Sequence, residues 1–338
     1  MALNKKSLIN RIWVGLLIFI VMVGMILLNI FLPNYSSGEK NMFISGRAIN
    51  SVIISALILL SVIEMRRALG KERIPDSFSW LLWLYGIGIM PVYSLFGFMG
   101  MLFFSMIVFI VAVITAMLRN RADSLIYIAF MLVYPGLFMA TLLYLNRSAA
   151  TGSYAVADPM YDYLETDIWT FLNRILGTER ADANLLPVNA VALSLVFAVS
   201  TLTDVFAYFV GSLLGKHKLC PDISPKKTVE GAIGGIFGGL LGSALVFFVF
   251  DYFAIFGKQF ALGFVGLKWY YVMITYILIG LLGSVATQIG DLLASMVKRY
   301  CGVKDYSRIL GEHGGIMDRF DGIMLNSVLV SFVFMFIL

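Results

Sequence analysis

The sequence predicts an all-α integral membrane protein with about nine transmembrane helices. Of its 338 residues, 60% are hydrophobic and only 13% are charged, whereas soluble domains are about 45–50% apolar and about 25% charged. The mean hydropathy is +0.90. One buried core cannot account for this excess of apolar residues, so we expect much of it to face lipid.

Nine apolar stretches are long enough to cross a membrane, which takes about 20 mostly apolar residues. The first follows a basic start like that of a signal peptide. Its apolar run is too long for one and no cleavage site follows, so we expect a retained helix. The third and fourth stretches meet around Leu95–Gly100. The nine ranges are 13–33, 48–64, 79–97, 99–118, 124–145, 187–214, 231–256, 269–296 and 317–338.

The positions of the charges predict the orientation of the chain. Most of the 25 Lys and Arg residues fall on one side if the N-terminus is cytoplasmic and the C-terminus is outside. Residues 1–185 are then an N-terminal transmembrane region with an acidic outer loop at 146–186. Residues 186–338 are a C-terminal transmembrane region that carries the candidate site. Because the basic residues lie in short loops, the net charge of +5 indicates anionic headgroups or phosphates rather than nucleic acid.

The seventh apolar stretch carries two stripes of glycines. In each stripe the glycines recur every four residues, which allows neighbouring helices to approach closely. The stripes therefore predict helix packing, either within the chain or between two protomers of a homodimer. They are Gly231, Gly235 and Gly239, and Gly234, Gly238 and Gly242.

A basic loop precedes this glycine-rich helix, and Thr228 is the expected N-cap residue. The start of a helix offers free N–H groups and the positive end of the helix dipole, both of which favour anions. Ser224, Lys226 and Lys227 gather there. We expect them to bind phosphate; the alternative is a loop that only sets the membrane topology.

Four aspartates lie in or beside the last apolar stretches. Asp291 is about two turns inside the cytoplasmic end of its helix, where a carboxylate is costly without a partner or a cation. Asp318 and Asp321 are three positions apart at the start of the last helix. Asp204, inside the sixth stretch, is either a ligand or a partner of Tyr208 or of a neighbouring helix. Carboxylates with basic residues nearby suit Mg²⁺ bound together with phosphates.

Polar and basic side chains accompany these acids. Ser295 and Lys298 share one helix face with Asp291. His313 is either a donor to a phosphate oxygen or a structural turn residue. The other candidates for phosphate binding are Arg299, Lys304 and Arg319. Together these residues predict a cytoplasm-facing site at the membrane boundary that transfers a phosphoryl or nucleotidyl group to or from a lipid.

A dense pattern of residues runs through this last part of the chain. It reads Ser295-x-Val297-Lys298-Arg299-x4-Lys304-Asp305-x-Ser307-x2-Leu310-Gly311-x-His313-Gly314-Gly315-Ile316-x-Asp318-Arg319-Phe320-Asp321. This pattern resembles the signature of phosphatidate cytidylyltransferases (CDP-diacylglycerol synthases). Three earlier stretches also resemble that family, so the resemblance covers about residues 200–325. They are Asp204-x3-Tyr208-x2-Gly211, Gly215-Lys216-His217-Lys218 and Ser224-Pro225-Lys226-Lys227-Thr228-x-Glu230-Gly231. Val205 and Val229 depart from the family pattern, but neither is an expected ligand.

The resemblance implies that CMP passes from CTP to phosphatidic acid, giving CDP-diacylglycerol and pyrophosphate. It implies a multi-pass protein of the cell membrane with its site on the cytoplasmic face, and CTP, phosphatidic acid and membrane lipid as partners. The expected catalytic residues are Asp291, Asp318, Asp321 and Lys227. The expected Mg²⁺ ligands are Asp291, Asp318, Asp321 and Asp204. The expected phosphate-binding residues are Ser224, Lys226, Lys227, Ser295, Lys298, Arg299, Lys304, His313 and Arg319.

Three alternatives remain open from the sequence. A different acceptor, such as an ether phospholipid, would keep the nucleotide and change the lipid. A CTP-dependent polyprenol kinase would transfer the γ-phosphate instead. An ion-coupled transporter would use the intramembrane acids to bind ions, but it is expected to show repeated broken helices. No second copy of the Asp291 or Asp318 segment occurs in the first half of the chain.

Overall fold

The computed structural model describes residues 5–32, 46–147, 188–253, 255, 268–311 and 314–337. Nearly all of the expected acidic loop at 146–186, and His313, lie outside these residues. The chain divides into two compact units, which are considered separately below. The first contains Met1–Arg147 and Val303–Arg319, and the second contains Asp182–Gly302 and Phe320–Leu338.

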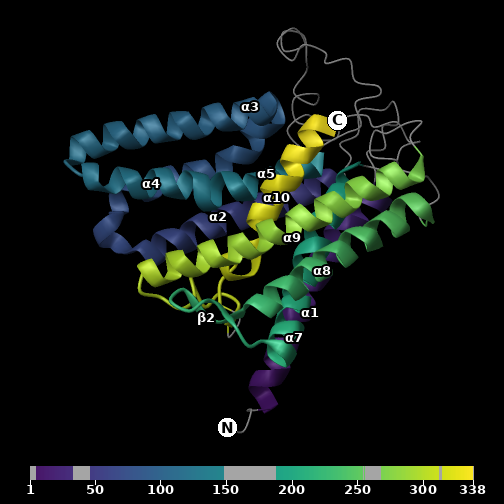
Figure 1. Ribbon diagram of the computed structural model, residues 1–338. Helices are drawn as coiled ribbons and strands as arrows, with labels where there is room; N and C mark the ends of the chain where they lie inside the picture. The colour runs from purple at the N-terminus through teal and green to yellow at the C-terminus, as the bar shows by residue number, and fades with distance from the viewer. Residues whose placement is uncertain are drawn as a thin grey trace, which may run out of the picture. The chain divides into compact units, whose positions relative to one another are not determined.

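Helices make up most of the described chain (Figure 1). Those of the first unit are α1 (Lys5–Phe31), α2 (Gly46–Arg73), η1 (Asp76–Phe78), α3 (Ser79–Arg119), η2 (Ala122–Ser124), α4 (Leu125–Met131), η3 (Leu132–Leu137) and α5 (Phe138–Arg147). The elements of the second unit are α7 (Val188–Leu214), β1 (Lys218–Cys220), β2 (Ser224–Thr228), α8 (Val229–Phe247), η5 (Phe248–Tyr252) and α9 (Trp269–Tyr300). Helix α10 (Met317–Ile337) begins in the first unit and continues into the second.

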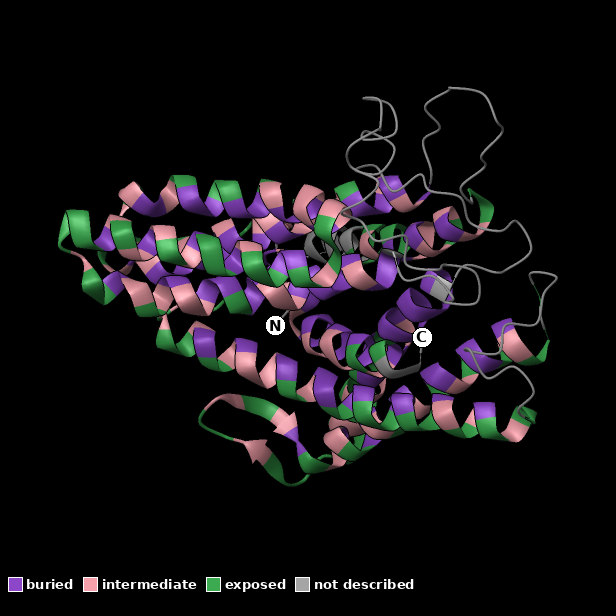
Figure 2. Cartoon of the chain, turned by 90° about the horizontal axis from the view of Figure 1, so that it is seen from above, coloured by how far each residue is buried: buried purple, intermediate pink, exposed green. Residues whose placement is uncertain are grey.

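Six helical stretches among the described residues are long and apolar enough to cross a membrane, against the nine expected from the sequence. Their outward faces carry large apolar side chains, such as Ile87 and Phe103 on α3 and Phe237 on α8. Figure 2 shows such exposed faces along the helices, beside faces that are buried. The six stretches are Gly46–Arg73, Asp76–Arg119, Ala122–Asn146, Asn189–Leu214, Val229–Tyr252 and Trp269–Tyr300.

Helix α3 contains both the third and the fourth expected stretch. It is 41 residues long, but its backbone leaves the helical conformation at Gly97, where φ is 63° and ψ is −158°. Glycine adopts a positive φ without the steric cost that a side chain would add. The break at Gly97 lies within Leu95–Gly100, where the sequence predicts that the two stretches meet.

The second unit is held together by close contacts of the α8 glycines. A Cβ atom at Gly238 would lie 2.2 Å from the carbonyl oxygen of Leu202 on α7. On the other stripe, a Cβ atom at Gly239 would lie 2.4 Å from the Cβ of Ser284 on α9. The prediction that the stripes serve helix packing is therefore confirmed within the chain, where α7, α8 and α9 lie side by side (Figure 1).

The described chain is mainly helical, as the sequence predicts, but the basic loop before α8 contains a short antiparallel hairpin that the sequence did not predict. Lys218 pairs with Thr228, and Cys220 pairs with Ser224. The backbone N–H of Val229 then donates to the carbonyl oxygen of His217 at 2.9 Å, which ties the start of α8 to the first strand. The hairpin therefore fixes the basic residues of β2 at the N-terminus of α8.

We expect Gly238→Ala to destabilise the second unit, because the new methyl group meets a backbone carbonyl that cannot move aside without shifting α7. Overpacking of this kind costs about 1–3 kcal/mol. The measurement is the thermal unfolding midpoint of the purified protein in detergent. Gly24→Ala on α1 is the matched control, since its Cβ has no atom within 4 Å. Equal midpoints for the two variants would contradict the close contact between α7 and α8.

Candidate functional site

A pocket of about 340 Å³ lies in the second unit between α7, the hairpin, α8 and α9. Four of the expected site residues line it: Asp204 from α7, Lys226 and Lys227 from β2, and Asp291 from α9. The tertiary fold thus brings together residues that are up to 87 positions apart in the sequence. The hydrogen bond between Ser200 and Thr287 joins the same two helices, α7 and α9. The pocket is the candidate site of this unit.

Lys227 and Asp291 form an ion pair inside this pocket. Their Nζ and Oδ2 atoms are 2.6 Å apart, and the two side chains are 25% and 33% exposed. When a carboxylate and an ammonium group pair in a half-buried position, loss of either one leaves the other as an uncompensated charge. The residue expected to bind phosphate and the residue expected to bind metal are therefore direct partners. Each becomes available to an incoming ion of opposite charge when the pair opens.

The N-terminus of α8 forms one wall of the pocket, and the predicted cap is confirmed. Thr228 has extended backbone angles, and its side chain accepts a hydrogen bond from the N–H of Gly231 at 3.1 Å. Both residues line the pocket. The positive end of the α8 dipole therefore lies beside Lys226 and Lys227, which makes this wall favourable for an anion.

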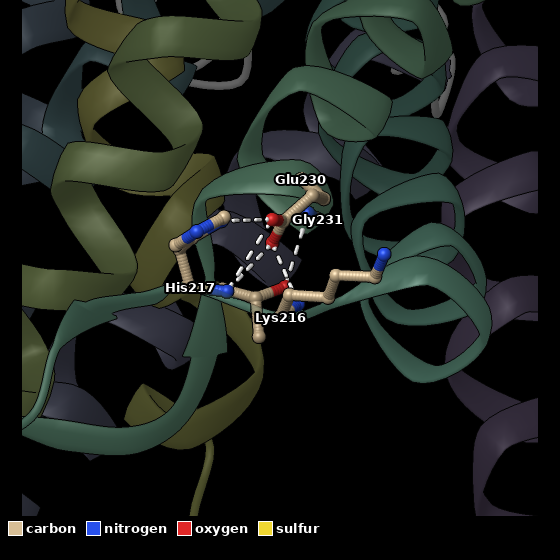
Figure 3. Close-up of polar contacts among 5 residues, drawn as sticks. Lys216, His217, Glu230 and Gly231 are labelled. Atoms are coloured by element: carbon tan, nitrogen blue, oxygen red, sulfur yellow. Dashed lines mark hydrogen bonds and ion pairs between the residues drawn. The ribbon is translucent and has the colours of Figure 1, made fainter.

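Glu230 holds the turn that leads from α7 into the hairpin, as Figure 3 shows. Its Oε2 accepts from the backbone N–H of Lys216 at 3.0 Å and from that of His217 at 3.2 Å. Its Oε1 is 2.6 Å from Nδ1 of His217. The sequence motif includes Glu230 but did not predict a role for it. The structure shows that this carboxylate anchors the hairpin to the first turn of α8.

A further acid lies close to this group of charges. Asp321 on α10 interacts electrostatically with Asp291, Lys298 and Asp204. The close approach has a backbone cause: a Cβ atom at Gly290 would lie 2.6 Å from the carbonyl oxygen of Asp321. The residue just before Asp291 must therefore be small for α9 and α10 to bring their acids together.

About one helical turn from these acids, a set of buried neutral side chains connects α7, α9 and α10. Asn326 Nδ2 on α10 donates to Ser200 Oγ at 2.9 Å and to the carbonyl oxygen of Val196 at 3.1 Å. Ser200 Oγ is in turn 3.1 Å from Thr287 Oγ1 on α9. Ser200 precedes Asp204 by one helical turn, and Thr287 precedes Asp291 in the same way. These hydrogen bonds between apolar helices hold the turns of α7 and α9 that carry Asp204 and Asp291 in a fixed position relative to each other.

Gln288 is a pocket residue that the sequence reasoning missed. Its Nε2 donates to the carbonyl oxygen of Ala232 on α8 at 3.1 Å. It lies three positions before Asp291, on the same side of α9. The sequence did offer a signal for Gln288, because a polar residue one helical turn from Asp291, within an apolar helix, is a candidate site residue.

The remaining expected residues occupy three places. Ser295, Lys298 and Arg299 lie in the last two turns of α9, and Arg299 Nε donates to the carbonyl oxygen of Ile223 in the hairpin at 3.4 Å. Ser224 lies on β2. Lys304, Asp318 and Arg319 belong to the first unit.

In the first unit, Asp318 has a structural role that the sequence did not predict. Its Oδ2 accepts from the backbone N–H of Gly315 at 2.8 Å and from that of Tyr306 at 2.9 Å. Gly314 has a φ of 81°, and a Cβ atom there would lie 2.7 Å from the same oxygen. The carboxylate of Asp318 therefore holds the segment before α10 in place through these two hydrogen bonds.

A magnesium ion in this pocket would need ligands beyond the carboxylates of the protein. Among the residues that the structure describes, no three Asp, Glu, His or Cys side chains form a ready metal cage. Mg²⁺ is commonly held by one or two carboxylates, with phosphates and water as the other ligands. Asp291 and Asp321, which interact with each other in the second unit, supply a ligand set of that kind.

Comparison with known proteins identifies the family of this chain. The phosphatidate cytidylyltransferase of Staphylococcus haemolyticus is 43% identical to this chain over 141 residues, which are 40% of this chain and 47% of the relative. The enzymes of the same name from Staphylococcus saprophyticus and Staphylococcus aureus are 45% and 42% identical over 140 residues, with the same coverage. These matches thus span about half the length of the relatives. The model of the cytidylyltransferase family matches residues 16–338, and the chain therefore belongs to this family.

Proposed function

We propose that this protein transfers CMP from CTP to phosphatidic acid, giving CDP-diacylglycerol and pyrophosphate, with Mg²⁺ as its cofactor. The observation that carries the proposal is the ion pair between Lys227 and Asp291 at the N-terminus of α8. It supports the proposal because a cation suited to phosphate and an acid suited to a metal ion line the same pocket. The names of the relatives supply the nucleotide and the lipid, which the geometry does not name.

The reaction needs little acid–base chemistry from the protein. A phosphate oxygen of the lipid attacks the α-phosphorus of CTP, and pyrophosphate leaves from the opposite side. The lipid phosphate is already largely ionised near neutral pH, so no strong general base is required. The main obstacle is the repulsion between two anions. Bound Mg²⁺ supplies positive charge that draws the phosphates together and stabilises the leaving group.

The residues of the pocket take separate parts in this scheme. Lys227 exchanges its partner Asp291 for a phosphate oxygen, and the positive end of the α8 dipole favours the same anion. Asp291 and Asp321 would then be the residues that hold the metal. Within the second unit, the other proposed phosphate-binding residues are Ser224, Lys226, Ser295, Lys298 and Arg299, and Asp204 is a further proposed metal ligand. For Lys304, His313 and Arg319 as phosphate-binding residues, and for Asp318 as a metal ligand, the proposal rests on the sequence pattern alone.

The proposed setting is a multi-pass protein of the cell membrane, with nine spanning helices and a cytoplasmic N-terminus. The basic residues of the hairpin and of the end of α9 support a site on the cytoplasmic face. A homodimer through α8 would use its exposed apolar face, since the glycines pack within the chain. Ile233, Phe237 and Leu241 form that face.

The activity is tested with purified protein in mixed micelles with phosphatidic acid, Mg²⁺ and CTP labelled at the α- or γ-phosphate. We expect the α-label to enter the lipid and the γ-label to leave as pyrophosphate. Entry of the γ-label into a lipid such as polyprenol would instead establish a kinase. If neither label moves with any lipid offered, including ether lipids, the enzymatic proposal is wrong and ion transport is the next assay.

Replacing Lys227 by Met is expected to lower kcat about 10²–10³-fold, as the loss of one preorganised electrostatic partner usually does. Lys218→Met is the matched control, because Lys218 lies on the other strand of the hairpin and does not line the pocket. Steady-state rates of both variants, at equal amounts of folded protein, make the comparison. A similar loss in both would show that general positive charge matters, rather than the position of Lys227.

Asp291→Asn and Asp318→Asn are each expected to abolish turnover while the protein stays folded and membrane-inserted. The second variant is informative because an asparagine oxygen still accepts from the N–H groups of Gly315 and Tyr306, so only the charge is lost. The measurement is the rate as a function of Mg²⁺ concentration after EDTA treatment, with circular dichroism as the check on folding. Substantial activity in either variant would remove that residue from the metal site.

A further inference from the structure

The first unit contains a buried carboxylate that the mechanism above does not use. Glu64 on α2 is 0% exposed. Its Oε1 accepts from Ser307 Oγ at 2.6 Å and from the backbone N–H of Ile316 at 3.0 Å. Its Oε2 accepts from the backbone N–H of Met317 at 2.9 Å. All of these partners belong to residues 303–319, which are more than two hundred positions away in the sequence.

These donors explain why a carboxylate is tolerated at this position. A buried charge in an apolar helix is costly unless hydrogen bonds satisfy it. Ile316 and Met317 stand at the start of α10, where backbone N–H groups have no acceptor within their own helix. The positive end of the α10 dipole points toward the same carboxylate. Glu64 therefore caps α10 from another helix.

The contact between Glu64 and this segment requires a glycine at position 315. A Cβ atom there would lie 2.4 Å from Oε2 of Glu64 and 2.6 Å from Oε1, so a side chain would displace the carboxylate. On its other side, the N–H of Gly315 donates to Asp318 at 2.8 Å. The segment before α10 is therefore held between two carboxylates, one from α2 and one from α10 itself.

We propose that Glu64 is a positioning residue, which sets the first turn of α10 and the segment before it in the geometry needed for catalysis. The segment and turn carry Lys304, Asp318 and Arg319, which are expected to bind phosphate or metal. Glu64 acts through its hydrogen bonds to this segment and touches no reacting atom. For its effect on activity, this inference depends on the function proposed above.

The first test is hydrogen exchange, which needs no activity and so stands even if the proposed reaction is wrong. In Glu64→Ala, we expect the amides of Ile316 and Met317 to exchange at least tenfold faster, because they lose the carboxylate that accepts from them. Glu64→Gln should give a smaller increase, since one amide oxygen replaces two acceptors. Unchanged exchange in Glu64→Ala would overturn the inference.

The matched control is Ser61→Ala, one turn earlier on α2. Ser61 is also 0% exposed, and its hydroxyl makes no hydrogen bond within the described part of the chain. We expect its exchange at Ile316 and Met317 to match the wild type. If Glu64→Ala does not fold, Ser307→Ala removes one bond to the same carboxylate, and it should raise exchange in the same amides by a smaller factor.

The second test separates positioning from a general loss of stability. At equal amounts of folded protein, Glu64→Gln is expected to lower kcat at least tenfold and to raise the Mg²⁺ concentration for half-maximal rate, because Asp318 is held less firmly. Ser61→Ala should change neither value. A normal kcat and a normal Mg²⁺ requirement in folded Glu64→Gln would show that Glu64 serves stability alone. Faster exchange without any cytidylyl transfer in the wild type would instead overturn the proposed function and keep the structural role.

Discussion

An apolar environment requires each charged group and each helix end to find its partner within the protein, because no water is available to replace a missing hydrogen bond. This requirement governs the arrangement of both units. Glu64 is satisfied by three donors at the start of α10. The charged groups of the second unit are partly exposed, and they too are paired: Asp291 with Lys227, and Glu230 with the N–H groups of the turn before the hairpin. The charged residues thus fix the loops and helix starts that carry the candidate site.

The helix turns that carry the charged residues must also come close together. Glycines at the contacts between helices make this close approach possible. Contacts at Gly238 and Gly239 bring α7 and α9 against α8, and the contact at Gly290 brings α10 against α9. A larger residue at any of these positions would separate the backbones and with them the aspartates. Packing and chemistry are therefore linked, because the same close contacts that stabilise the second unit set the distance between its acids.

The acids divide into two kinds by their surroundings. Asp291 faces a pocket and a lysine, so its partner is exchangeable. Asp318 and Glu64 accept backbone N–H groups, which a substrate does not displace without unfolding the segment before α10. The proposed function needs both kinds of contact. Under it, Asp291 would change partners during turnover, while Glu64 and the N–H contacts of Asp318 would keep the backbone before α10 in place.

The helical membrane-type fold, the N-cap at Thr228, the break near Gly97 and the motif residues of the candidate site could all be predicted from the sequence. Each of these depends on local composition or short spacing, which a single chain displays directly. The pairing of Lys227 with Asp291, the place of Gln288 in the pocket and the capping of α10 by Glu64 could not be predicted in this way. These contacts join residues from separate helices, and nothing in local hydrophobic pattern says which helices will be neighbours. The hairpin was missed for a related reason: its strands are only three and five residues long, and their pairing rather than their composition makes them strands.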